Sequence, residues 1–225
     1  MAGKRRKATV TAPVCPHCGA GVEAGPATTV VRPRTAEMEA LFRGGLNRRE
    51  CPACGKAFSL DTPVLFRDDS GPFLIYFLPL TDRERRLEAA GEMASITARA
   101  FPESGDALPA CRIAFTRRQF LEKIAVRMQG LDDRVIEYVK YQMFRNPKQK
   151  IDAIRNELFF DFSPDHPEQL GFLVFDRESG AAVGTARLPM AVYRELAEAL
   201  SGPRGLNEEL DRLFPGVHVS VEELL

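Results

Sequence analysis

Two copies of one cysteine motif carry the clearest chemistry in the chain. Cys15 and Cys18 lie in the pentapeptide Cys-Pro-His-Cys-Gly, and Cys51 and Cys54 lie in Cys-Pro-Ala-Cys-Gly. Two residues between cysteines let one tight turn direct both sulfurs at the same ion, and two such turns complete a tetrahedral shell of thiolates. The spacing therefore predicts a metal site formed by Cys15, Cys18, Cys51 and Cys54, with zinc as the expected ion.

The predicted site is structural rather than catalytic. Four thiolates fill the coordination shell of zinc and leave no position for a water molecule or a substrate. The glycine that follows each motif's second cysteine, Gly19 or Gly55, suits a turn that reaches positive φ, where a side chain would clash. We expect one structural Zn²⁺ and no catalytic residue among the cysteines.

Two other kinds of chemistry use similar cysteine spacing. Thiol–disulfide oxidoreductases place a Cys-x-x-Cys pair at the N-terminus of a helix, but residues 19–26 contain three glycines and a proline and are unsuited to that helix. A rubredoxin-like iron centre would carry electrons, but the chain has no tryptophan and few aromatic residues near the pairs. Redox catalysis and iron-based electron transfer remain alternatives to zinc.

The composition is that of a folded protein. The chain has 225 residues, of which 44% are hydrophobic and 28% are charged. The longest apolar run, residues 73–80, is well below the roughly 18 residues of a membrane-spanning helix. The basic first residues lead into no apolar stretch, so we expect no secretion signal. We predict a cytoplasmic protein whose cysteines do not form disulfides.

Residues 11–62 are predicted to form a zinc-ribbon module behind a flexible basic tail, residues 1–10. Extended stretches at 9–14 and 27–32 flank the first motif, and Thr35 caps a short helix over 36–43. The module contains few large apolar residues, so the ion must hold it together. Residues 1–60 contain ten basic and four acidic side chains, a charge of +6. This basic front indicates a non-enzymatic module that contacts another protein, with nucleic acid as the second candidate partner.

Residues 63–225 are predicted to form an α+β domain with an antiparallel sheet and several helices. Thr116 and Gln119 form a capping box at the start of a helix that Gly130 ends, and Asp132 opens the next helix. The other expected elements are strands at 63–67, 73–78, 111–115, 158–162, 171–175 and 181–188, helices at 82–99 and 189–201, and an exposed linker at 101–109.

A few further residues could carry chemistry. Asp132, Asp133 and Glu137 cluster at a helix start and could act as general acids or bases or as a second metal site. We expect instead that the aspartates favour the positive end of the helix and that Glu137 pairs with Arg134 or Lys140 on the helix surface. Cys111 lies in an alternating apolar strand, which favours an inert buried thiol. No role is assigned to the three histidines.

The chain resembles the CpXC family, which is named for its two Cys-Pro-x-Cys pairs. The resemblance spans about residues 11–145 and includes residues 63–68, 112–116, 122–124 and 130–137 as well as the cysteines. Phe66 departs from the family pattern, where an aromatic hydroxyl is commoner, and it lies outside the proposed ligands. The resemblance implies zinc binding and does not imply a particular reaction.

Overall fold

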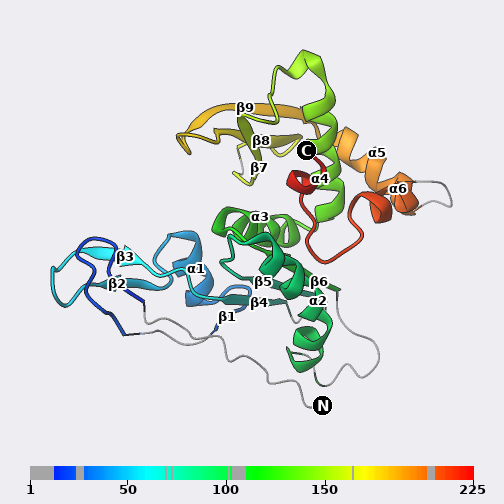
Figure 1. Ribbon diagram of the computed structural model, residues 1–225. Coiled ribbons are helices and arrows are strands. Elements are labelled where there is room, and N and C mark those ends of the chain that lie inside the picture. The colour runs from blue at the N-terminus through cyan, green and yellow to red at the C-terminus, as the bar shows by residue number, and fades with distance from the viewer. Residues whose placement is uncertain are drawn as a thin grey trace.

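The computed structural model describes residues 13–23, 28–68, 70–71, 73–100, 102, 110–163, 165–201 and 206–225. An arm that carries the cysteines extends to one side of a body made of two β-sheets with helices around them (Figure 1). The α+β fold class predicted from the sequence is confirmed.

The lower layer of the body is a four-stranded sheet in the order β1-β4-β5-β6. Its strands are β1 (Thr29–Val31), β4 (Val64–Asp68), β5 (Phe73–Phe77) and β6 (Ala110–Ala114). The predicted hairpin is present as the antiparallel pair β4–β5, but β1 and β6 run parallel to their neighbours, so this sheet is mixed. Helix α2 (Arg83–Ala100) carries the chain back along the sheet between β5 and β6, which makes that pair parallel.

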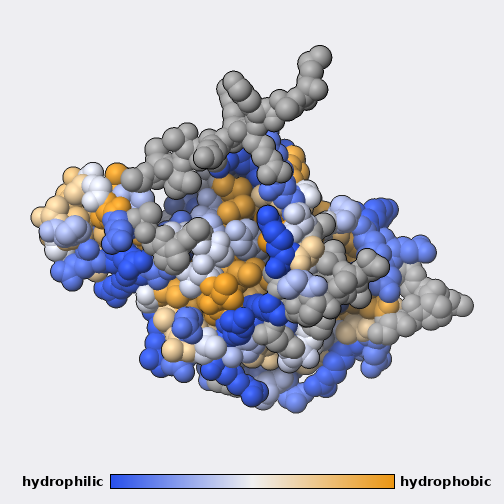
Figure 2. All heavy atoms as spheres, turned by 90° about the horizontal axis from the view of Figure 1, so that it is seen from below, coloured by the Kyte–Doolittle hydropathy of each residue, from blue (hydrophilic) through white to orange (hydrophobic). Residues whose placement is uncertain are grey.

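Helices cover the two faces of this sheet unequally. Helices α1 (Ala36–Phe42) and α3 (Arg117–Met128) pack on the upper face, where Phe66, Phe77 and Phe120 are almost fully buried. On the lower face, Met93 of α2 packs against Ile113, while Val30 at the opposite edge remains 42% exposed. Seen from below, hydrophobic residues lie in patches towards the middle of the face, with hydrophilic residues between and around them (Figure 2).

The upper layer is an antiparallel sheet with helices against it, as the sequence predicted. Its strands follow the order β7-β8-β9, and a core of fifteen buried residues joins them to the helices. The elements are α4 (Asp133–Arg145), η2 (Pro147–Gln149), β7 (Asn156–Asp161), β8 (Gln169–Asp176), β9 (Ala182–Pro189), α5 (Met190–Ser201), α6 (Leu206–Leu213) and η3 (Val221–Leu224).

Helix α3 lies between the two layers and contacts both (Figure 1). The capping box predicted at its start is present: the Thr116 side chain accepts from the backbone N–H of Gln119, and the Gln119 side chain accepts from that of Thr116. Seven of its twelve residues are buried, including Glu122 and Lys123. A helix with protein on opposite sides buries even its charged residues, provided that each has a partner.

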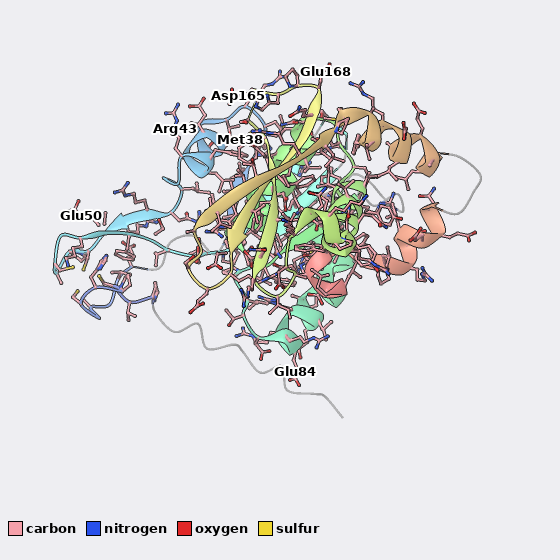
Figure 3. The ribbon with its side chains drawn as sticks, turned by 90° about the horizontal axis from the view of Figure 1, so that it is seen from above. Met38, Arg43, Glu50, Glu84, Asp165 and Glu168 are labelled. Atoms are coloured by element: carbon pink, nitrogen blue, oxygen red, sulfur yellow. The ribbon has the colours of Figure 1, made fainter. Side chains whose placement is uncertain are left out.

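The arm is built on a hairpin of β2 (Arg48–Glu50) and β3 (Ala57–Ser59), two strands that the sequence did not predict. Every residue of β2 is exposed, so its side chains carry no apolar alternation from which a strand could be recognised. Glu50 marks the arm in Figure 3 and lies far from Glu84 at the start of α2.

Several predicted segments can be located only in part. Of the strand expected at 9–14, residues 9–12 lie outside the described part of the chain, and Val14 forms only an isolated bridge with Gly21. The linker expected at 101–109 also lies outside it, apart from residue 102. The boundary predicted after residue 62 stays a prediction, and β1 and α1, which lie between the cysteine pairs, pack in the core of the lower layer.

Candidate metal centre

The two cysteine motifs fold into the same backbone turn. In the first turn, the N–H of Gly19 donates to the carbonyl of Cys15 (2.9 Å), and the N–H of Cys15 donates to the carbonyl of Ala20 (2.8 Å). In the second, Gly55 donates to Cys51 (2.8 Å) and Cys51 donates to Lys56 (3.0 Å). The sequence repeat is therefore also a structural repeat.

Both turns require glycine at the same position. Gly19 has φ of 74° and Gly55 has φ of 68°, in the left-handed region that side chains disfavour. Each turn is also closed by an antiparallel β-bridge between the residue before the first cysteine and the residue seven positions later, Val14 with Gly21 and Glu50 with Ala57. The positive φ predicted for the two glycines is confirmed.

The two turns face each other and bring four sulfur atoms together. The sulfurs of Cys15, Cys18, Cys51 and Cys54 all lie within 4.8 Å of one another. The Sγ atoms of Cys15 and Cys54 are 3.9 Å apart, and those of Cys18 and Cys51 are 3.6 Å apart. A tetrahedron with metal–sulfur bonds of about 2.3 Å has edges of about 3.8 Å, so the cluster has the dimensions of a four-thiolate site.

The surroundings of the sulfurs shift the thiol pKa values in different directions. The backbone N–H of His17 donates to the sulfur of Cys15 (3.4 Å), so a turn residue contributes through its backbone rather than its imidazole. Burial raises the pKa of the Cys51 thiol, but the backbone N–H groups of Cys54 and Ala53 donate to its sulfur and lower the pKa to about 7. The backbone N–H of Ala20 lowers the pKa of the Cys18 thiol, but the neighbouring thiols and burial outweigh it and raise this pKa to about 12. The backbone N–H of Lys56 likewise lowers the pKa of the Cys54 thiol, but burial and neighbouring thiols outweigh it and raise this pKa as well. Of these three thiols, only Cys51 therefore has a lowered pKa without an ion, and the sulfurs would need the charge of a metal to ionise together.

Little apolar packing supports this cluster. Cys15 and Cys51 are each 1% exposed, and the only other buried members of their apolar cluster are Phe58 and Leu60. Cys18 is exposed. The cysteines themselves are thus half of the buried core of the arm, as the small number of large apolar residues in this part of the sequence suggested.

The acidic residues at the start of α4 have structural partners. Asp132 caps the helix by accepting from the backbone N–H of Arg134 (2.8 Å). Asp133 accepts from Arg112 (2.8 Å) and from the ammonium of Lys123 (3.1 Å). Among the described residues, the cysteines form the only cluster of potential metal ligands, so these carboxylates do not assemble a second site.

Glu137 pairs with Lys140 at 2.9 Å, as predicted, but the pair is buried rather than on the helix surface. Lys140 also contacts Glu122 of α3 at 2.6 Å, and the second oxygen of Glu137 accepts from the backbone N–H of Val221 at 2.9 Å. These bonds join three elements. This cluster could not be recognised from the sequence, because its members are spread over residues 122–221 and belong to elements whose packing is not encoded locally.

The other cysteine and the histidines considered in the sequence analysis lie outside the cysteine cluster. Cys111 is partly buried in β6 and is a free thiol. His17 and His166 are exposed, whereas His218 is largely buried, with its ring 4.7 Å from that of Phe115. The burial of His218 was missed, because an isolated histidine between two valines carries no periodic signal.

Comparison with known proteins identifies the family. No curated protein and no solved structure matches the chain. Among the described residues, no helix combines the length and the apolar character needed to cross a bilayer. Residues 11–140 match the CpXC family, described as CpXC protein, and this range includes both cysteine turns, the lower layer and the first part of α4. The chain belongs to the CpXC family.

Proposed function

We propose that Cys15, Cys18, Cys51 and Cys54 bind one Zn²⁺ ion and that this ion holds the arm in shape as a non-enzymatic interaction module. The observation that carries the proposal is the convergence of two equivalent turns on one point, with four sulfurs within 4.8 Å of one another. A single Cys-x-x-Cys pair is enough for thiol–disulfide exchange. The second pair is accounted for by a metal ion that needs four ligands.

Two features favour zinc over the alternatives. The segment after Cys18 continues into a β-bridge at Gly21 rather than into a helix whose N-terminus would activate a redox thiolate. The arm's buried cluster contains one aromatic residue, Phe58, which is little insulation for an iron centre. Zinc needs no such insulation, because it does not change oxidation state.

The surface of the arm supports an interaction with an acidic partner. Arg48 and Arg49 are exposed on β2, Lys56 is exposed at the second turn, and Arg34 and Arg43 are exposed near the base of the arm. Glu39 pairs with Arg43 at 3.6 Å, but both side chains are more than two-thirds exposed, so the pairing is weak. The partner that fits this surface is a protein with an acidic patch.

Metal analysis tests the site most directly. Protein purified without added metal is expected to contain one zinc per chain, and Cys51→Ser is expected to lose it. Cys111→Ser is the matched control, because Cys111 lies outside the cluster and should leave the zinc content unchanged. If the purified protein instead contains iron and shows visible thiolate-to-iron absorption, the zinc proposal is wrong and the site is an electron-transfer centre. If the protein is free of metal and has a Cys15–Cys18 disulfide, the zinc proposal is also wrong and the cysteines act in thiol–disulfide exchange.

The interaction surface needs a separate test. The variant Arg48→Gln/Arg49→Gln should keep its zinc and lose partners that wild-type protein retains in a pull-down. Arg194→Gln/Arg212→Gln, with the same charge change on exposed residues of α5 and α6, should keep those partners. If both double variants retain the same partners, the basic surface of the arm is not the binding site.

A further inference from the structure

A cavity of about 350 Å³ lies in the body, between α2 and the chain segment that leads into η3. Its volume falls within the range of small-molecule sites. In Figure 1 this segment descends towards β6 and α2, and the backbone N–H of Ile113 in β6 donates to the carbonyl of Val217 at 3.0 Å. The walls are mainly apolar and include Leu87, Ala90, Phe115, Leu213, Phe214 and Val217.

Two arginines of α2 line the cavity without a carboxylate partner. Arg86 donates from Nε to the carbonyl of Leu80 (2.7 Å), and its guanidinium carbon lies 5.0 Å from the centre of the Phe115 ring. Among the described residues, neither Arg83 nor Arg86 forms an ion pair. Glu84, between them in sequence, points away from the body in Figure 3. Glu223 is the one carboxylate among the lining residues, so two arginines face one acid and the apolar cavity carries a net positive charge.

The larger cavity beside α3 and α4 provides a contrast. It has a volume of about 560 Å³ and is also lined by arginines. There, Arg112 pairs with Asp133 at 2.8 Å, Arg127 with Asp68 at 2.9 Å, and Arg134 with Asp132 at 3.4 Å. Arginines that already have carboxylate partners have less to gain from an anionic ligand, so the smaller cavity is the better candidate site.

His218 adds a second unsatisfied polar group to the smaller cavity. Its Nδ1 atom lies 3.4 Å from a carboxylate oxygen of Glu223. A carboxylate can only accept, so Nδ1 holds the proton and Nε2 of a neutral imidazole is an acceptor. Nε2 is buried and has no hydrogen-bond partner. Burial together with Lys123 and Arg86 lowers the pKa of His218 to about 4, so the imidazole is neutral near pH 7.

We propose that this cavity binds a small organic acid, with its apolar body against Phe115 and Leu87 and its carboxylate between Arg86 and His218. The carboxylate pairs with the guanidinium and places a negative charge beside the imidazole, which favours the protonated ring against the effects of burial and of the nearby cations. His218 then takes up a proton from solvent, and Nε2 donates to the ligand. The charged groups that bear on His218 are Arg83 and Arg86 of α2, Lys123 of α3, Glu137 of α4 and Glu223 of η3. The site is independent of the cysteine cluster.

The test is a calorimetric titration with sodium octanoate, and with 1-octanol as its uncharged counterpart. Octanoate should bind wild-type protein, and Arg86→Gln should weaken binding by about tenfold or more, because a charge-assisted hydrogen bond contributes at least that factor. Arg85→Gln is the matched control, since Arg85 is the exposed neighbour in α2 and does not line the cavity. Arg86→Lys, which keeps the charge, should retain part of the affinity if loss in Arg86→Gln is not a folding defect.

The role of His218 is tested by pH. Octanoate should bind wild-type protein more tightly at pH 6 than at pH 8, because binding takes up a proton, and His218→Phe, which keeps a ring against Phe115, should lose this dependence. Octanoate and octanol binding equally well, or an affinity that Arg86→Gln and Arg85→Gln change alike, would overturn the proposal. So would no detectable octanoate binding, or an affinity independent of pH in the wild-type protein.

Discussion

The arm and the upper layer of the body differ in what holds them together. The apolar cluster of the arm has four buried members, and two of them are the cysteines Cys15 and Cys51. The upper layer has fifteen buried apolar residues, supplemented by buried ion pairs around Lys140 and Lys123. Apolar burial is therefore sufficient to account for the upper layer but not for the arm. Under the proposed function, the arm needs an ion to keep its shape and the upper layer does not.

Removing the metal should cause the largest loss of structure of all the changes considered, and that loss should be confined to the arm. Structural zinc contributes on the order of 10 to 16 kcal/mol of apparent binding free energy in small sites, which is comparable to the stability of a whole domain. After chelation, we expect backbone amides of residues 46–60 to lose protection in hydrogen exchange, because no common ion then joins the two cysteine turns. The amides of β8 and α4 should keep theirs.

The variant Cys54→Ser removes one proposed ligand and should reproduce the effect of chelation, with Cys111→Ser as the control. If chelation unfolds the upper layer as well as the arm, the distinction between the two regions is wrong. If arm amides exchange at the same rate with and without metal, the ion is not structural. Both outcomes are visible in one peptide-resolved experiment.

Breaking a buried charge cluster should have the largest effect within the body. Lys140 is 2% exposed at its side chain and lies between Glu122 and Glu137, which are 5% exposed. Lys140→Met leaves two buried carboxylates without a cation, a change that costs about 3 to 5 kcal/mol. We expect a lower denaturation midpoint in urea with unchanged zinc content. Lys148→Met, on an exposed residue after α4, should change neither quantity.

As the pH falls, the arm should lose its metal first, and the body should lose stability at a lower pH. Lys123 and Arg112 outweigh the effect of burial and lower the pKa of Asp133 to about 2 from an ordinary value of 3.8. A lowered carboxyl pKa contributes stability above the unfolded-state pKa, here about 2 kcal/mol, and this is lost as pH falls from roughly 4 to 2.

Thiolates must be protonated before the metal leaves, and a four-thiolate site releases zinc on acidification. We expect a zinc-binding dye to report release at a higher pH than the loss of far-ultraviolet circular dichroism from the body. Asp133→Asn should reduce the pH dependence of the body's stability between pH 4 and 2 and leave zinc release unchanged. Simultaneous release and unfolding in both proteins would contradict the separation of the two regions.

Sequence patterns predicted the features that depend on local geometry. The Cys-Pro-x-Cys-Gly repeat predicted both turns and their glycines, because hydrogen bonds within six residues define each turn. The Thr116–Gln119 box and the Asp132 cap were also predicted, since a cap requires residues only a few positions apart. The convergence of the four sulfurs followed from the chemistry of the ligands rather than from any signal in the residues between them.

Features that depend on contacts distant in sequence could not be predicted in the same way. The parallel pairing of β1 with β4 depends on a connection through the arm, and both strands are compatible with an antiparallel arrangement when considered alone. Burial of Glu122, Lys140 and His218 results from packing between elements, and charged residues on a predicted helix are ordinarily assigned to its exposed face. Helix α6 was missed, although the spacing of Leu206, Leu210 and Leu213 is that of one helix face.

The smallest predicted effect concerns a cap of the helix between the two layers. Thr116→Ala removes the hydroxyl that accepts from the Gln119 backbone N–H at 3.2 Å, and the loss of such a cap costs about 1 kcal/mol. In a protein of this size that corresponds to a melting temperature lower by about 2 to 4 °C. Thr185→Ala, on an exposed position of β9, is the control and should stay within about 0.5 kcal/mol of wild type. Because α3 packs on both layers of the body, the Thr116 variant should melt earlier and keep its zinc. Zinc loss in this variant would mean that the arm depends on the body for its metal site.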